Sequence, residues 1–332
     1  MSIEKKWRVL GVLGALCVPA LVTAAFNLPF TFKAGSPIKA DEVNANFEAL
    51  RARFNGQFLR AEVGTLTLPG VLAASPIRSF TQSIDVPVLV VGAGVGNAKP
   101  VFSDIEISRD AGAGTPSLNL LVNQQKLLPT ADIVMGNLSV HLTDVIVSGV
   151  SVNGVQVGHA QETVRLAFST VQWSWQEGKA PAKVASWDRV KSVGAGAGPL
   201  PPAFAYFAPG VAPTADYVPI TGYSHRLSCA VSPCKVAQGA VTVQKAVGPE
   251  TIDLLGTAAI AKHTPAVGLT WFTSATAASH SLALTDVLVS NVILTTGEDG
   301  TVNEMDDFAY STITWTAGKV QTGWDAIKGA AL

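Results

Sequence analysis

The chain contains one stretch of sequence twice, and this repeat limits the folds that it can adopt. Leu-Thr-Asp-Val-Ile-Val-Ser at 142–148 returns as Leu-Thr-Asp-Val-Leu-Val-Ser at 284–290, which lies 142 residues further along. At the same offset, Glu162 returns as Glu304, and Phe-Ser-Thr-Val-Gln-Trp at 168–173 returns as Tyr-Ser-Thr-Ile-Thr-Trp. A repeat of this length marks one structural unit that occurs twice. The 332 residues therefore predict two similar domains, each large enough to bury its own core.

Each copy reads mostly as β-strands with one short helix. Residues 102–109 alternate apolar and polar side chains as half-buried strands do, and residues 117–122 suit a short helix over one end of a sheet. Near the end of the copy, the alternation that runs to Phe168 resumes at Val171 instead of residue 170, and the second copy repeats this change. We expect a β-bulge or a sharp bend between two closing strands.

Composition between the copies indicates a linker, since residues 179–212 are rich in Gly, Ala and Pro. Only 14% of the side chains are charged and the mean hydropathy is +0.33, which favours burial of surface against other subunits. The expected organisation is a signal peptide at 1–25, a stalk-like helical segment at 26–60, a first repeat domain at 75–178, the linker at 179–212, a second repeat domain at 213–318 and a C-terminal tail at 319–332.

The first 25 residues have the three parts of a secretory signal peptide. Lys5, Lys6 and Arg8 precede an apolar run at 9–22, and small residues follow at 23–25. The apolar run is about 14 residues long, which is short for a transmembrane helix. We expect cleavage, export to the periplasm or the outside, and no stable membrane insertion afterwards; an uncleaved anchor is the alternative.

The segment that follows predicts a helix with one apolar seam. Its apolar residues are spaced by 4, 3 and 4 positions: Val43, Phe47, Leu50 and Phe54. A single helix cannot bury such a seam by itself, so we expect a trimeric coiled coil or, alternatively, a helix docked on its own chain. The stretch resembles segments that precede stalks in bacterial and phage fibre-like proteins, which are commonly trimeric.

Two cysteines of the predicted mature chain lie close together in sequence. Cys229 and Cys234 are separated by four residues that include Pro233. In an exported protein, this pair favours a local disulfide. Free thiols and a metal site that includes His225 are the alternatives.

The sequence gives little support for an enzyme or a nucleic-acid-binding protein. Basic and acidic side chains are balanced, 23 against 24, so no basic excess is available to bind a phosphate backbone. The five histidines lack metal-binding spacing, and neither a G-x-S-x-G elbow nor a correctly spaced dinucleotide fingerprint is present. We therefore predict a non-enzymatic protein without cofactor or metal. Asp144 and Asp286 suit a turn or a cross-strand contact better than catalysis.

Three motifs together carry a family resemblance. They are Lys-Pro-Val-Phe-Ser-Asp at 99–104, the repeated Leu-Thr-Asp-Val strand, and the Glu, aromatic and Trp pattern that closes each copy. They resemble the haemolysin-coregulated protein (Hcp) family, the tube protein of type VI secretion, over about 80–176 and, more weakly, about 217–318. The resemblance implies two tandem Hcp-like β-barrels, each with a short helix. In that family, six barrels form a ring with a central channel, and rings stack into tubes.

We therefore predict a mostly β, exported structural protein whose homotrimer forms a pseudo-hexameric ring of six barrels. Its partners are further copies of itself, with stacked rings or other secretion or fibre components beyond them. The expected interface residues are Trp173, Trp315, Glu162, Glu304, Asp144 and Asp286. The signal peptide departs from type VI tube proteins, which are loaded from the cytoplasm. The alternative is an extracellular adhesin or ligand-binding module, with strand tryptophans as a stacking platform.

Overall fold

The computed structural model describes residues 43–44, 61–91, 94–97, 99–153, 160–207, 217–229, 236–274, 277–297 and 299–332. These residues are mostly β-strand, which confirms the mostly β part of the predicted fold class. The chain divides into two compact units, Met1–Leu59 and Arg60–Leu332. All the described strands belong to the second unit. The signal peptide and the seam residues Phe47, Leu50 and Phe54 lie outside the described residues, while Val43 is helical.

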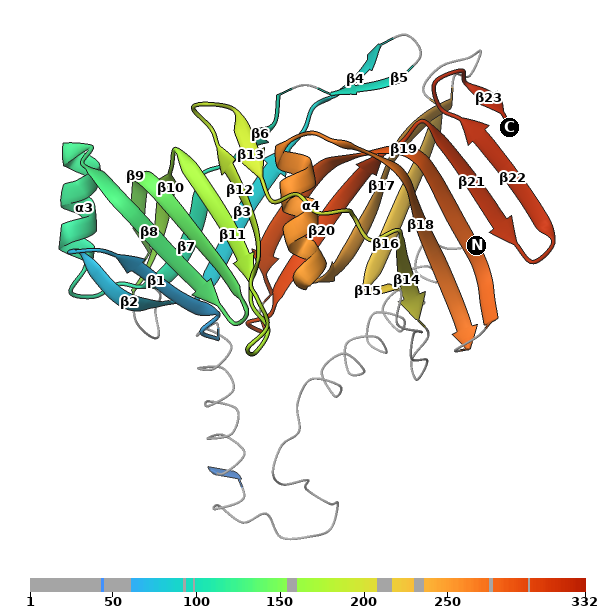
Figure 1. Cartoon of the computed structure of the whole chain (residues 1–332). Helices are drawn as coiled ribbons and strands as arrows, with labels where there is room; N and C mark the ends of the chain where they lie inside the picture. Colours follow the sequence, from blue (N-terminus) through green and yellow to red (C-terminus); the bar gives the residue numbers. More distant parts are fainter. Residues whose placement is uncertain are drawn as a thin grey trace, which may run out of the picture. The chain divides into compact units, whose positions relative to one another are not determined.

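The first half of the second unit carries one helix, α3 (Thr115–Gln124), packed against strand β9 (Figure 1). Its strands are β1 (Gly64–Leu68), β2 (Leu72–Ile77), β3 (Ser79–Asp85), β4 (Val88–Val91), β5 (Gly94–Asn97), β6 (Val101–Phe102), β7 (Ile105–Asp110), β8 (Leu127–Met135), β9 (Leu138–Asn153), β10 (Gln161–Ala167), β11 (Thr170–Trp175), β12 (Lys183–Asp188) and β13 (Val193–Ala195).

The second half also carries one helix, α4 (Pro249–Ala259), packed against strand β19. Its strands are β14 (Ala203–Phe207), β15 (Val218–Ile220), β16 (Gly222–Cys229), β17 (Val236–Ala246), β18 (His263–Ser274), β19 (Ala277–Thr296), β20 (Val302–Ala309), β21 (Thr312–Ala317), β22 (Val320–Asp325) and β23 (Ala330–Ala331).

The two halves repeat one succession of elements. The order β7, α3, β8, β9, β10, β11, β12 is matched by β17, α4, β18, β19, β20, β21, β22. The antiparallel pairings also match: β9 pairs with β8, β10 and β11, and β19 pairs with β18, β20 and β21. A residue with positive φ follows each helix, Gln125 directly after α3 and Ala261 two residues after the end of α4. The matching registers show which residue of the second half is the structural counterpart of a given residue in the first half.

The bend expected in each copy occurs where the long strand changes partner. Strand β9 pairs with β11 up to Thr143 and with β10 from Ile146 onward, so the closing segment is split into two strands. Asp144 lies between these stretches with φ of 52°, and Asp286 lies at the same place in β19 with φ of 49°. Aspartate tolerates this left-handed backbone better than most side chains. The repeated aspartate therefore has a role in bending the strand.

Asp286 is also held by two side chains of its own copy. The ring of His263 lies with Nδ1 2.7 Å from Asp286 Oδ1, and Ser311 donates its hydroxyl to Oδ2. These hydrogen bonds, led by Ser311, lower the pKa of Asp286. Asp144 is exposed instead. Contacts of either aspartate with another chain remain a prediction.

The segment expected to be a linker contains strands. Six residues of β12 pair with β11, and β14 pairs in parallel with β18. The average composition of 179–212 concealed the alternation within β12, where Ala185 and Trp187 are buried. Likewise, the expected tail at 319–332 contains β22, which pairs with β21, and β23. Strands β12 and β22 therefore each extend the sheet of the copy that precedes them, whereas β14 joins the sheet of the second copy.

Glu162 and Glu304 point into their own copies instead of towards an interface between barrels. Each lies on a strand with partners on both sides, and their exposed fractions are 0% and 1%. Arg109 Nη1 donates to Glu162 Oε1 at 2.6 Å. Lys245 donates to Glu304 at the corresponding place. A buried carboxylate is retained when a cation on the neighbouring strand pairs with it, so each glutamate neutralises a cation of its own copy.

The second copy buries more negative charge than the first. Glu250, Glu304 and Asp306 surround Lys245, and Asp306 stands where the first copy has Val164. Burial lowers the pKa of Lys245, but attraction to the three carboxylates outweighs it and raises this pKa to about 12. Burial and repulsion from Glu304 raise the pKa of Asp306 well above 3.8, against the attraction of Lys245. Asp306 therefore binds a proton at higher pH than an ordinary aspartate.

Replacing Asp306 by the valine of the first copy is expected to stabilise the protein. Because the folded-state pKa of Asp306 is raised, its contribution to stability is present below pH 3.8 and is lost as the pH rises towards the folded-state pKa. Asp306→Val removes this loss, so the gain should grow with pH, and burial of an imperfectly paired polar group suggests a size of about 1–3 kcal/mol. Urea unfolding at pH 4 and pH 8 measures it. Asp307→Val is the control, since Thr242 donates a hydrogen bond to Asp307; an equal gain from both variants would contradict the argument.

Candidate assembly surfaces

The two copies are joined by a strand pair that crosses between them. Five residues of β3 pair antiparallel with β19, from Asp85 opposite Asn291 to Thr81 opposite Thr295. Three apolar side chains in this pairing, Ile84, Val292 and Leu294, are fully buried. A continuous hydrogen-bonded sheet therefore runs from the first copy into the second.

Helix α4 of the second copy forms the other part of this junction. It contacts β11, β12 and β13 of the first copy in addition to β19 of its own (Figure 1). Lys183 on β12 donates to Asp253 on α4. A Cβ at Gly256 would lie 3.1 Å from the Cβ of Ala185 and 3.0 Å from the Cα of Ala197. A side chain at this position would push against Ala185 and Ala197, so glycine favours the close approach of the helix to the strand.

The counterparts of the crossing strands are unpaired edges in the described residues. Residues 149–153 of β9 correspond to 291–295 of β19, and among the described residues they pair with β10 alone. Strand β16 corresponds to β3, because Tyr223 pairs with Val243 as Phe80 pairs with Ile107, and it pairs with β17 alone. These two edges lie at opposite ends of the two-copy sheet.

Both edges expose apolar side chains at positions that the junction inside the chain buries. Val152 is 48% exposed, whereas its counterpart Leu294 is 0% exposed. Leu227 is 54% exposed, whereas its counterpart Ile84 is 0% exposed. Exposed apolar residues on an open strand edge are a site for pairing with another chain.

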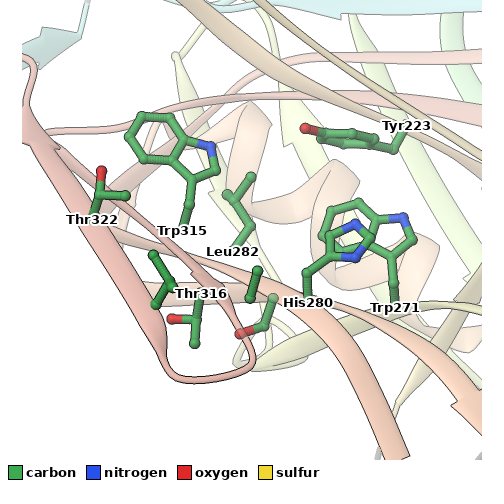
Figure 2. Close-up of a pocket in the computed structure, with 10 residues that line it drawn as sticks. Tyr223, Trp271, His280, Leu282, Trp315, Thr316 and Thr322 are labelled. Atoms are coloured by element: carbon green, nitrogen blue, oxygen red, sulfur yellow. The ribbon is translucent and has the colours of Figure 1, made fainter.

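The counterpart of the α4 docking surface is an open aromatic pocket in the second copy. Its cavity of about 230 Å³ is lined by residues of β16, β18, β19, β21 and β22, and Figure 2 shows the rings arranged around Leu282. Trp271 and His280 stack with their centroids 4.3 Å apart and an angle of 12° between the rings. Tyr223 meets Trp271 edge-on at 4.8 Å, and burial raises the pKa of Tyr223.

The two predicted interface tryptophans have different surroundings. Trp173 of the first copy is fully buried, and its Nε1 donates to Gln82 Oε1 at 2.9 Å. Trp173 pairs in register with Ala185, the residue that α4 covers. Trp315 is only partly buried and lines the pocket with its partner Thr322. The same strand position is therefore closed in one copy and open in the other.

The sequence interpretation missed most of the pocket and both exposed edges. Tyr223, Trp271 and His280 come from three strands, and their neighbours in space are set by pairings that the repeat alone does not reveal. One signal was available in the repeat: Leu120 of the first helix corresponds to Gly256 of the second, counted from the positive-φ residues that follow both helices. A leucine aligned with a glycine at one helix position indicates different neighbours.

The described residues offer little for other kinds of site. No group of three or more His, Cys, Asp or Glu side chains within them is arranged to hold a metal ion. Neither α3 nor α4, nor any other helix described, has the length and hydrophobicity needed to span a bilayer. Cys229 ends β16, and Cys234 lies in the segment 230–235, outside the described residues, so the disulfide stays a prediction.

Comparison with known proteins supports the family resemblance for the first copy. Residues 73–175 match the family model described as "Type VI secretion system effector, Hcp". No curated protein matches the chain. Hcp1 from Salmonella typhimurium is 23% identical, covering 39% of this chain and 95% of that one, with a TM-score of 0.34. A type VI secretion system effector from Yersinia pestis is 17% identical, covering 38% and 98%, with a TM-score of 0.30.

The family model begins at residue 73 in β2 and ends at residue 175, the last residue of β11. It therefore takes in α3 and most of the strands of the first copy, including the edge at 149–153. The chain carries a domain of the Hcp family at residues 73–175.

Proposed function

We propose that this chain is an exported structural protein that forms a ring by repeating, between chains, the junction between its two copies. Residues 213–318, extended by β22 and β23, form a second Hcp-like domain in this proposal. The edge of β16 in one chain pairs with residues 149–153 of β9 in the next. The observation that carries the proposal is the exposure of Val152 and Leu227 where the chain itself buries Leu294 and Ile84.

The geometry of the junction bears on the kind of assembly. The two edges lie on different elements, so the contact between chains is heterologous, and repeating it gives a closed ring or an open helix. The pairing inside the chain already joins two copies in the proposed way. If successive junctions are equivalent and six barrels close the ring, as the family resemblance implies, three chains complete it. A trimeric helical segment at 26–60 and a signal peptide at 1–25 fit this assembly and its export.

The mass of the mature protein in solution tests the proposal. Light scattering on a sizing column is expected to give three chains, and negative-stain images of the same peak should show six-lobed rings. A monomer at micromolar concentration, without rings, would contradict it. The aromatic pocket favours the second candidate, an exported ligand-binding module, which that result would support.

A further inference from the structure

The uncovered pocket of the second copy has a counterpart on the surface of α3. In the first copy, the equivalent surface is occupied by α4, which lies on Lys183 and Ala185. The corresponding positions of β22 are Val320 and Thr322, because they pair with Ala317 and Trp315 as Lys183 and Ala185 pair with Trp175 and Trp173. Both Val320 and Thr322 line the pocket, and Val320 is 67% exposed.

Helix α3 exposes the face that α4 buries. Residues 251–259 of α4 are all buried, whereas in α3 only Leu118 and Leu121 are buried. Leu120 of α3 is 54% exposed and corresponds to Gly256 of α4. Leu120 thus places one large apolar side chain in solvent at the centre of a ten-residue helix, at the position where α4 is covered by the first copy.

We propose that the aromatic pocket of one chain receives α3 of the next chain, with Leu120 entering the cavity. This inference rests on the proposed ring and assigns its second contact. Inside the chain, glycine meets a filled surface, at Ala185 and Ala197. Between chains, leucine meets a cavity of about 230 Å³ lined by Trp315, Leu282 and Thr322. The large side chain of Leu120 is thus matched to the open pocket, and Gly256, which has no side chain, is matched to the closely packed surface at Ala185.

The polar contacts of the two junctions follow the same complementarity. Asp253 of α4 pairs with Lys183, and burial raises the pKa of this aspartate against the effect of the lysine. The corresponding residues between chains are Ser117 and Val320, which carry no charge. Docking of α3 therefore leaves no buried charge unpaired. An α4 helix placed in the pocket would bring Asp253 against Val320, so the pocket selects α3 and fixes a head-to-tail order.

A cysteine pair tests this docking directly. In the junction inside the chain, a Cβ at Gly256 would lie 3.1 Å from the Cβ of Ala185, a little nearer than the roughly 3.5–4.5 Å between the Cβ atoms of a disulfide, so a small outward shift brings the equivalent pair between chains within range. The variant Leu120→Cys with Thr322→Cys is expected to form disulfides between chains on mild oxidation. Non-reducing electrophoresis should then show covalent dimers and trimers that dithiothreitol removes. The control is Leu127→Cys with Thr322→Cys, since Leu127 is 55% exposed but lies on β8.

The outcomes separate this inference from the proposed ring. A trimer in which the Leu120 and Thr322 pair links no better than the control would overturn the docking and leave the ring intact. A protein that stays monomeric throughout would overturn both. A second measurement examines the pocket itself: Leu120→Asp should weaken the trimer at least tenfold, and Leu127→Asp should not. An unchanged trimer with Leu120→Asp whose tryptophan fluorescence responds to N-acetylglucosamine would assign the pocket to a soluble ligand instead.

Discussion

Leu227→Asp is expected to convert the assembled protein into single chains. Leu227 lies on the exposed edge of β16, where the counterpart Ile84 is buried against β19 inside the chain. Placing a carboxylate in such a pairing costs about 2–3 kcal/mol, which lowers the affinity of each contact roughly a hundredfold. Sedimentation velocity over a range of concentrations measures the change. Val190→Asp is the control, since Val190 is 78% exposed and lies outside both edges.

Mixing two variants gives a sharper form of this experiment. Val152→Asp disables the edge of β9, and Leu227→Asp disables the edge of β16, so each variant keeps one intact edge. A mixture should form dimers with one chain of each kind and no rings, because a heterologous contact joins unlike edges. Dimers of a single variant, or rings in the mixture, would contradict the pairing of β16 with β9.

Lys245→Met is expected to cause the largest loss of stability. Lys245 is fully buried and donates to Glu304, to Glu250 at 2.9 Å and to Thr251 at 3.1 Å. Removing the cation leaves buried carboxylates without a counter-charge, which costs about 3–5 kcal/mol. Denaturant unfolding at one protein concentration measures the cost, since assembly adds to apparent stability.

Two further variants show whether the buried charge is responsible. Lys191→Met removes a surface pair with Asp188 in which the lysine is 76% exposed, and should cost less than about 1 kcal/mol. Adding Asp306→Val to Lys245→Met should restore part of the loss, because one fewer carboxyl then needs neutralising. Equal losses from Lys245→Met and Lys191→Met would show that the cluster contributes little.

The features that the sequence predicts well are those encoded by short-range spacing. The repeat, the mostly β character and the break between the closing strands, after Phe168 in the first copy, all follow from spacing within a few residues. Strand β12 was missed because its six residues lie within a segment of linker-like composition. The burial of Glu162 within its own copy was not predicted for a different reason. Its partner, Arg109, is 53 residues earlier in the sequence, and the polarity of a glutamate alone suggests exposure.

The candidate assembly surfaces depended on contacts further apart in sequence. Trp315 was singled out as an interface residue, but its pocket needs Tyr223 and Trp271 from other strands. The exposure of Leu227 and Val152 gains meaning only by comparison with the buried pair of β3 and β19. A repeat in the sequence shows which residues correspond. It does not show which copy of a surface is covered.

The pairing of β3 with β19 also has a consequence for how the chain folds. The backbone N–H of Phe80 donates to Thr296 Oγ1, a contact that spans 216 residues. During synthesis, β3 has no partner along this edge until β19 has emerged. The edge of β3 in the first copy therefore stays unpaired while the second copy is synthesised. Contacts of such long sequence separation slow folding and prolong the exposure of unpaired, aggregation-prone strand edges. Under the proposed export, in which the chain crosses a membrane unfolded, completing this sheet only afterwards is an advantage.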